Sequence, residues 1–172
     1  MEISVPRADG IIPTPIVSGD HVYVTADYGT GCKLIKINAS GDPTEIYDNK
    51  VMKNHHGGVI LFNDHVYGYS GNAGWVCQNF KTGVEVWVSK NLGKGPVSCA
   101  DGMLYCVDEN NGTVALSDAS PKGWQEHGRF KIDPQTTQRK PDGRIWTHPV
   151  ISNGRLYLRD QELIHCYKIA QD

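Results

Sequence analysis

The chain has 172 residues, enough for one compact domain with a hydrophobic core. Its 17 Lys and Arg against 19 Asp and Glu give a formal net charge of −2. This charge argues against a nucleic-acid partner, because binding the phosphate backbone needs a basic surface. No window approaches the roughly 18 apolar residues of a membrane-spanning helix. The first residues also lack the charged and apolar regions of a secretory signal, so the chain itself leaves the localisation open.

Glycine and proline are frequent, with 19 and 9 copies, and they separate short alternating runs of Val, Ile and Tyr. This pattern is typical of an all-β fold with many turns. The cysteines contain no CxxC pair, which is the spacing that zinc sites use. Because most of them lie in apolar runs, we interpret them as buried free thiols. They are Cys32, Cys77, Cys99, Cys106 and Cys166.

A fourfold repeat is the strongest pattern in the chain. In each copy a turn pair ends three residues before a tyrosine that lies in an apolar run. A fixed offset repeated four times predicts four equivalent structural units. The copies are VSGDHVYV, LFNDHVYG, CADGMLYC and ISNGRLYL, and their tyrosines are Tyr23, Tyr67, Tyr105 and Tyr157. We interpret these tyrosines as packing residues between neighbouring sheets, since aromatic side chains dominate core energetics.

Each copy predicts four short strands. The turn pair joins a first strand to the tyrosine strand, because Asn, Asp and Gly tolerate the positive φ of tight hairpins. A third strand follows a second turn, and a fourth strand is clearest in KTGVEVWVSK. Four antiparallel strands per unit of about 40–45 residues predict a β-propeller with about four blades. We expect a single partial propeller domain over 1–172, with blades at about 13–50, 55–92, 95–135 and 145–172.

The third copy is longer than the others. We expect its fourth strand around Trp124–Ile132, followed by a polar surface loop at 133–143 whose role the sequence does not decide. In the fourth copy, Asp160, Gln161 and Glu162 fall in a turn, which we interpret as a solvated loop.

The two ends of the chain leave two architectures open. The fourth copy has three strands, and Glu2–Val5 could supply an outer strand, so that residues 1–12 are an outer strand or a linker from a preceding blade. Either four blades close into a small ring, or the chain is half of a larger propeller. A partial ring has open blade faces and edges, which can pair with another chain or with further blades.

The segment WVCQNFKTGVEVW resembles the repeat of quinoprotein-type, or PQQ-like, β-propellers, which reads Ala-x-Asp-x-x-Thr-Gly-x-x-x-Trp. Thr82, Gly83 and Trp87 match this pattern, while Cys77 and Asn79 stand at its alanine and aspartate positions. The resemblance implies that Thr82-Gly83 forms the turn between the third and fourth strands. It also implies that Trp87 docks on the adjacent blade.

The other copies keep less of this motif. The first copy retains Ser40-Gly41 with Tyr47 as a displaced aromatic residue, and the third keeps Ala115 without the Thr-Gly turn. Across its length the chain resembles a bacterial subgroup labelled polyvinyl-alcohol-dehydrogenase-like, or likened to the outer-membrane assembly lipoprotein propeller. This resemblance favours the C-terminal part of a seven- or eight-bladed propeller, and it implies a periplasmic or secreted parent.

The resemblance also implies a cofactor for the full-length parent, pyrroloquinoline quinone (PQQ) with calcium. The sequence has no adjacent Cys-Cys pair and no Glu/Asn/Asp calcium set that a motif can place. We therefore assign no firm cofactor, no catalytic residue and no metal ligand. The propeller scaffold serves both enzymes and binding proteins, so the fold does not settle the function.

Candidate binding residues lie in the loops that lead into the first strand of each blade. In a radial arrangement these loops meet at one mouth of the central channel. Histidine suits a polar ligand site near neutral pH, although loop hydrogen bonding and metal binding are alternatives. For a metal, two histidines from non-adjacent blades are expected to lie too far apart. The candidates are Asn54, His55, His56, Lys94, Trp146 and His148.

The pair Gly57-Gly58 after these histidines occupies the place that Pro15, Pro96 and Pro149 hold in the other blades. We interpret it as a flexible turn into the first strand of the second blade.

Two functions from different classes follow. The first is a non-enzymatic propeller that acts as a binding or assembly scaffold for a protein partner or a small polar ligand. The second is a fragment of a PQQ-dependent alcohol or polyvinyl-alcohol dehydrogenase, which needs a cofactor platform and a general base. The missing cofactor motifs favour the scaffold.

Overall fold

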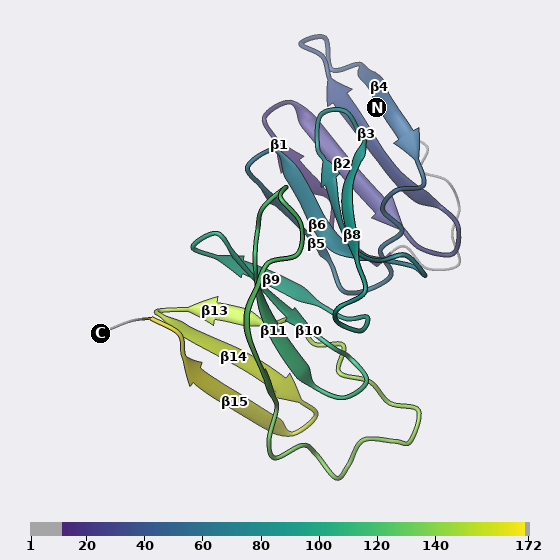
Figure 1. Ribbon diagram of the computed structural model, residues 1–172. Helices are drawn as coiled ribbons and strands as arrows, with labels where there is room; N and C mark the ends of the chain where they lie inside the picture. The colour runs from purple at the N-terminus through teal and green to yellow at the C-terminus, as the bar shows by residue number, and fades with distance from the viewer. Residues whose placement is uncertain (1–11, 171–172) are drawn as a thin grey trace.

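The computed structural model describes residues 12–170, and they form an all-β propeller arc without a helix (Figure 1). Four antiparallel sheets follow one another along the chain, and in each sheet sequence neighbours pair. Blades 1, 2 and 3 have four strands and blade 4 has three, as the four copies of the repeat predict. Within the described residues, no helix is long and apolar enough to cross a membrane.

Each blade is formed by consecutive strands of the chain. Blade 1 contains β1 (Ile16–Ser18), β2 (His21–Ala26), β3 (Gly31–Ile37) and β4 (Pro43–Asn49). Blade 2 contains β5 (Val59–Phe62), β6 (His65–Ser70), β7 (Gly74–Asn79) and β8 (Glu85–Ser89). Blade 3 contains β9 (Val97–Ala100), β10 (Met103–Val107), β11 (Thr113–Asp118) and β12 (Glu126–Lys131). Blade 4 contains β13 (Val150–Ser152), β14 (Arg155–Asp160) and β15 (Leu163–Lys168).

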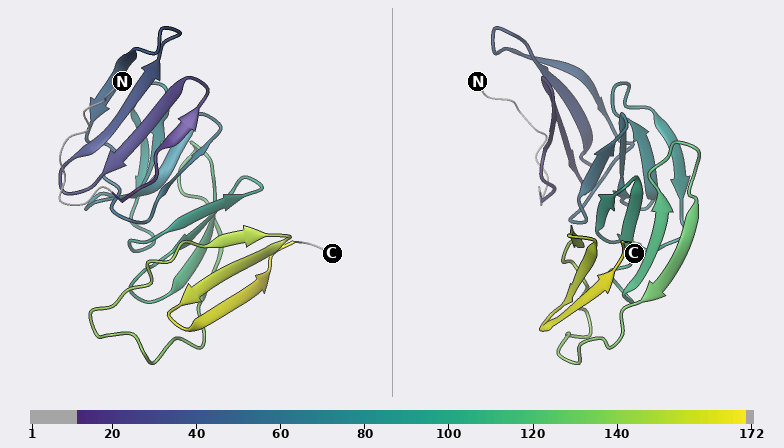
Figure 2. Two further views of the ribbon diagram at one scale, coloured as in Figure 1. Left: turned by 180° about the vertical axis from the view of Figure 1, so that it is seen from behind. Right: turned by 90° about the vertical axis from the view of Figure 1, so that its left-hand side faces the viewer.

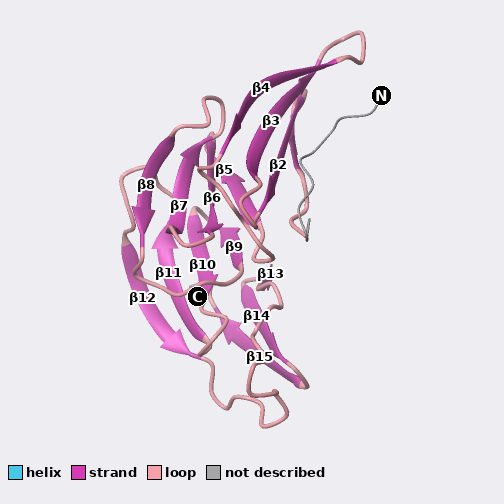
Figure 3. Cartoon of the chain, turned by 90° about the vertical axis from the view of Figure 1, so that its right-hand side faces the viewer, coloured by secondary structure: helices cyan, strands magenta, loops and turns pink. Residues whose placement is uncertain are grey.

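The blades are arranged as an open arc. Strands β5, β9 and β13 lie on its inner side, and β8 and β12 lie on its outer side (Figure 3). The inner strand β9 contacts both β5 and β13. Blade 1 and blade 4 lie at opposite ends of the arc (Figure 2). The expected outer strand at Glu2–Val5 falls outside the described residues.

The repeated tyrosines define the packing between blades. In each blade, one line of directly paired residues crosses the sheet through the tyrosine, and we call this line the tyrosine row. In blades 1 to 3 it faces the next blade, where a cluster of buried apolar side chains fills each junction. The rows are Ile16-Tyr23-Leu34-Tyr47, Ile60-Tyr67-Cys77-Trp87, Ser98-Tyr105-Leu116-Gly128 and Val150-Tyr157-Cys166.

The junction between blades 1 and 2 also contains buried hydrogen bonds. Tyr23 is fully buried, and its hydroxyl donates to Oε1 of Gln78 at 2.8 Å. The Gln78 amide in turn donates to the carbonyl of Gly83 at 2.8 Å. A buried hydroxyl without a partner is costly, so this pairing fixes the position of blade 2 relative to blade 1.

Thr82 and Gly83 lie in the turn between β7 and β8, and Trp87 lies on β8. Asn79 Oδ1 accepts from the Thr82 N–H at 2.9 Å and from its hydroxyl at 3.0 Å, which closes the turn between β7 and β8. The Trp87 indole N–H donates to the carbonyl of Ser120 in blade 3 at 2.8 Å.

Tyr47 in blade 1 takes the place that Trp87 holds in blade 2. Tyr47 pairs with Leu34 as Trp87 pairs with Cys77, and its hydroxyl donates to the Phe80 carbonyl of the next blade at 2.8 Å. Tyr47 is thus displaced in the sequence motif, where a longer turn precedes it, and it lies at the Trp87 position in the sheet.

The acidic turn of blade 4 corrects another expectation. Asp160 is 1% exposed rather than solvated, and Arg139 binds it with two nitrogens. The Thr136 N–H also donates to Asp160 at 3.1 Å, and the Thr136 hydroxyl donates to Glu162. The loop at 133–143 is thus fastened to blade 4, and a buried carboxylate requires such partners.

Two equivalent glycines test how closely the blades approach. Gly41 and Gly83 both have positive φ, 88° and 71°, in the turns before β4 and β8. A Cβ on Gly41 would meet nothing within 4 Å, whereas one on Gly83 would lie 2.6 Å from Asn49 Nδ2 and 2.8 Å from the Tyr47 ring. We expect Gly41→Ala to lower the free energy of unfolding by about 1 kcal/mol through backbone strain.

We expect Gly83→Ala to lower the free energy of unfolding by about 2–4 kcal/mol, because a clash between blades 1 and 2 adds to the backbone strain at positive φ. Urea unfolding of both variants measures the difference. Equal losses in the two variants would contradict close packing at the blade 1–blade 2 junction.

Candidate binding site at the mouth of the arc

Loops from all four described blades meet at one end of the sheets. Because strands alternate in direction, the turn between the second and third strands lies at the same end as the loop that connects successive blades. A set of side chains joined by hydrogen bonds and ring contacts lies there, and we call it the mouth cluster. It consists of Tyr28, His55, His56, Lys94, Glu109, Trp146 and His148.

The centre of the mouth cluster is a chain of hydrogen bonds between three blades. His56 Nε2 lies 2.7 Å from Oε2 of Glu109, and both side chains are only 10% exposed. His56 Nδ1 lies 2.8 Å from His55 Nδ1, and Lys94 Nζ lies 3.0 Å from the same His55 nitrogen. His55 Nε2 lies 2.9 Å from the Tyr28 hydroxyl.

The donors and acceptors constrain this chain at His55. The Lys94 ammonium has only donors, so His55 Nδ1 accepts from it. A neutral His55 then carries its hydrogen on Nε2, which donates to the Tyr28 hydroxyl. His56 contacts His55 through Nδ1 and the Glu109 carboxyl group through Nε2, and it links blade 2 to blade 3.

The surroundings of His55 agree with this assignment. Burial lowers the pKa of its imidazole from the ordinary value of 6.5, and the nearby Lys94 and His56 lower it further. Asp27 and Glu109 act in the opposite direction with smaller effect. Lowering the pKa keeps His55 neutral, as its role as an acceptor requires.

Backbone contacts bring blades 2, 3 and 4 together beneath the cluster. His148 Nε2 lies 2.8 Å from the backbone carbonyl of His56. A Cβ on Gly57 would collide with the carbonyl of Gly95, and one on Gly58 would lie 2.7 Å from the His148 ring. Gly58 also has φ of 72°. The two glycines are therefore needed for close approach between blades as well as for the turn.

The contact between blades 2 and 4 joins the His148 ring to the backbone carbonyl of His56 and not to its ring. The expectation that histidines of non-adjacent blades lie too far apart concerned joint binding of a metal, and this contact does not test it. The described residues nevertheless contain no group of three or more His, Cys, Asp or Glu side chains that could hold a metal ion.

The remaining candidates differ in their exposure. Trp146 is 57% exposed and packs its ring edge against His56, with centroids 5.2 Å apart. Tyr28 on the other side of the cluster is 60% exposed. Asn54 is 1% exposed, and its amide donates to the carbonyls of Gly58 and Tyr69, both at 3.0 Å. Asn54 thus supports the loop beneath the exposed part of the cluster.

Tyr28 and Glu109 belong to the cluster but were not among the sequence candidates. Both lie in turns between the second and third strands of their blades, in the segments DYGTG and DENNG. The useful signal was the strand direction, which places these turns at the same end as the histidine loops. The backbone of Glu109 is held from two sides, by Lys94 O and by the Ile145 N–H, both at 2.8 Å.

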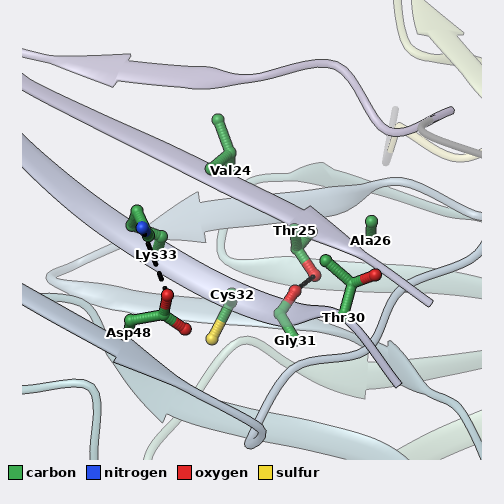
Figure 4. Close-up of a pocket in the computed structure, with 8 residues that line it drawn as sticks. All are labelled: Val24, Thr25, Ala26, Thr30, Gly31, Cys32, Lys33 and Asp48. Carbon is green, nitrogen blue, oxygen red and sulfur yellow. Dashed lines mark hydrogen bonds and ion pairs between the residues drawn. The ribbon is translucent and has the colours of Figure 1, made fainter. Parts of the chain in front are cut away.

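A separate small cavity in blade 1 is too small to be a ligand site. It has a volume of about 10 Å³, the space of about one water molecule, and Figure 4 shows the side chains that line it. Its polar groups are already paired: Lys33 binds Asp48, and the Thr25 hydroxyl donates to the Gly31 carbonyl at 3.1 Å (Figure 4).

Comparison with known proteins shows the fold. No protein-family model matches the chain, and no curated protein matches it. BamB from Moraxella catarrhalis superposes with a TM-score of 0.65 at 17% identity, over 91% of this chain and 42% of that chain. The quinohemoprotein alcohol dehydrogenase ADHIIG from Pseudomonas putida HK5 superposes with a TM-score of 0.64 at 17% identity, over 87% of this chain and 28% of that chain. The computationally designed Ika8 protein superposes with a TM-score of 0.66 at 11% identity, over 94% of this chain and 47% of that chain.

These likenesses establish the β-propeller architecture, and they do not transfer an activity. The chain spans less than half the length of each of these solved chains.

The protonation pattern of the mouth cluster can be tested at His55. We expect Lys94→Met to raise the pKa of His55, because it removes a neighbouring positive charge that disfavours the imidazolium. Histidine side-chain NMR titration of the wild type, of Lys94→Met and of the distant control Lys81→Met measures this shift. An unchanged pKa in Lys94→Met would contradict the contact between Lys94 and His55.

The same shift has a consequence for stability. The folded-state pKa of His55 lies below its unfolded value, so its contribution to stability is fully present above pH about 6.5. That contribution is lost as the pH falls below 6.5 towards the folded-state pKa. Lys94→Met should make the loss from His55 smaller.

Proposed function

We propose that this chain is part of a propeller that works as a non-enzymatic binding scaffold, with the mouth cluster as its binding site. The observation that carries the proposal is that all four described blades contribute to one connected polar cluster. Such a site depends on the propeller fold and on no single blade. We further propose that the chain corresponds to the C-terminal part of a seven- or eight-bladed, periplasmic or secreted protein.

The exposed side chains of the mouth cluster suit an extended protein segment. Trp146 and Tyr28 are large exposed rings on either side of polar groups that are already ordered by hydrogen bonds. Aromatic residues are enriched among the residues that dominate protein interfaces. An ordered cluster also loses little side-chain entropy when a partner binds. The similarity to BamB is consistent with a propeller that has this architecture.

The alternative is a fragment of a quinone-dependent alcohol dehydrogenase. The observation in its favour is the superposition on a quinohemoprotein alcohol dehydrogenase. Calcium prefers several oxygen ligands, usually including carboxylates. The described residues do not fit such an ion, because they contain no cluster of three or more His, Cys, Asp or Glu side chains suited to a metal. We therefore derive no reaction step through PQQ or calcium.

The binding proposal can be tested with short capped peptides. The probes are four acetylated and amidated heptapeptides, namely acidic, basic, Tyr-rich and Gly-Ser, with the Gly-Ser peptide as the blank. We expect at least one of the first three to shift the His55 and His56 NMR signals saturably. Trp146→Ala should weaken that binding at least tenfold, because it removes an exposed aromatic contact.

Ile46→Ala is the matched control, since Ile46 is 43% exposed on β4 of blade 1 and is not part of the mouth cluster. It should leave the affinity unchanged. Absence of any saturable shift would contradict the proposal. Tight binding of PQQ in the presence of calcium, with dye-linked oxidation of ethanol, would favour the dehydrogenase instead.

A further inference from the structure

A polar cavity opens on blade 4 beside the mouth cluster. Its volume is about 230 Å³, which is far more than one water molecule needs and enough for a side-chain group of a ligand. The lining comes from two segments, residues 144–147 before β13 and residues 159–161, where β14 turns towards β15. Trp146 belongs both to this cavity and to the mouth cluster, so the two sites share one wall.

Both segments of the cavity are fixed by contacts within the propeller. Ile145 is 3% exposed in the junction between blades 3 and 4, and its N–H donates to the carbonyl of Glu109 at 2.8 Å. The Thr147 hydroxyl donates to the carbonyl of Arg159 at 2.6 Å, which ties the first segment to the second. Arg144 directly precedes the buried Ile145, so its backbone is held in place as well.

Each segment places one guanidinium at the cavity, Arg144 from the first and Arg159 from the second. Arg144 donates from Nη1 to the carbonyl of Gly143 at 3.0 Å. Arg159 donates from Nε to the carbonyl of Gln161 at 2.8 Å. Each bond holds the planar group by one nitrogen. Because a guanidinium carries several N–H donors, both groups keep donors for a ligand.

The cavity has an excess of positive charge. Arg129 and Arg139 each form an ion pair with a carboxylate. Among the described residues, Arg144 and Arg159 bind backbone carbonyls and no carboxylate. Asp160 is the acidic residue in the described lining, but it is 1% exposed and Arg139 already binds it with two nitrogens. A surface with such an excess attracts an anionic group.

We propose that this cavity binds a carboxylate of an acidic protein segment, and we call it the carboxylate pocket. A guanidinium offers parallel N–H donors that match the two oxygens of a carboxylate, and two guanidiniums can share one such group. Trp146 is 57% exposed at the edge of the pocket, where its ring can cover the methylene groups of a glutamate side chain. The inference rests on the proposed function and adds to it the chemical class of the partner.

The position of the pocket favours a protein segment over a free small anion. The pocket shares Trp146 with the mouth cluster, and Tyr28 on the other side of that cluster is also largely exposed. A chain that crosses the mouth can therefore place one acidic side chain in the pocket while it contacts both rings. Ion pairs at an exposed site contribute little on their own, so a free anion lacks the contacts that add to them.

Two matched capped heptapeptides test the pocket, the acidic one and a counterpart in which every Glu is replaced by Gln. NMR signals of the Trp146 indole N–H and of the Arg144 and Arg159 Nε–H groups report on the pocket. We expect the acidic peptide to shift these signals saturably and to bind at least tenfold more tightly than the Gln peptide. This comparison uses the unaltered chain, so it stands even where a variant fails to fold.

Variants of the two arginines provide the second measurement. Arg144→Gln and Arg159→Gln should each weaken binding of the acidic peptide about tenfold, because each removes a charged donor. Arg155→Gln is the matched control, since the exposed Arg155 begins β14 and lies outside the pocket. It should leave the affinity unchanged, and circular dichroism checks that every variant is folded.

The outcomes separate this inference from the proposed function, because the His55 and His56 signals report on the mouth cluster. If the acidic and Gln peptides shift these signals with equal affinity, the mouth cluster remains a binding site and the carboxylate pocket is overturned. Unchanged affinity of the acidic peptide in folded Arg144→Gln and Arg159→Gln also overturns it. So does saturable binding of inorganic phosphate without binding of the acidic peptide. Absence of any shift with every peptide contradicts both proposals.

Discussion

The contact between one blade's tyrosine row and the next blade is the interaction on which the whole structure depends. A single sheet of three or four short strands cannot bury both of its faces, and its stability comes from the sheets on either side. The buried apolar clusters accordingly lie between blades. Each junction fixes the next blade's position, so small side-chain differences in a row set how tightly the arc is closed.

The junctions differ in how they fill the outermost position of this row. Tyr47 and Trp87 each reach across to a backbone carbonyl of the next blade, Phe80 and Ser120 respectively. Gly128 at the same position of blade 3 has no side chain, and a cavity lies beside it. The junction between blades 3 and 4 therefore depends more on other contacts. One of these is the Phe130 ring against Tyr167, with centroids 4.6 Å apart.

Much of this fold could be predicted from the sequence, because the signals that define it are local. The turn pairs sit at a fixed distance from each tyrosine, and residues at the turns, such as Asn63 and Asn153, do have positive φ. The fourth strand of blade 3, expected around Trp124–Ile132, is β12 at Glu126–Lys131. Tyr47 is displaced in sequence because a longer turn precedes it, but in the sheet it pairs with Leu34 as Trp87 pairs with Cys77, which residue counting does not detect.

The candidate site was predicted less completely, since its members come from separate turns. His55, His56, Lys94 and His148 could be located by counting from the tyrosines. Glu109 is recognised only once strand direction places its turn beside His56. Asp160 was misjudged for a related reason. Its acidic turn looks solvated in sequence, and its partly buried partner Arg139 lies 21 residues away in the preceding loop.

The mouth cluster and the blade junctions are physically coupled. The His56 ring belongs to blade 2, its hydrogen-bond partner Glu109 belongs to blade 3, and the His148 ring of blade 4 contacts the backbone carbonyl of His56. An ion pair that is largely shielded from water is sensitive to small changes in distance and solvation. Any change in how the blades pack therefore alters the contact of His56 with Glu109, and it also alters the environment of His55, whose pKa depends on the neighbouring Lys94, His56 and Glu109. The chemistry at the mouth is in this sense a property of the arc as a whole.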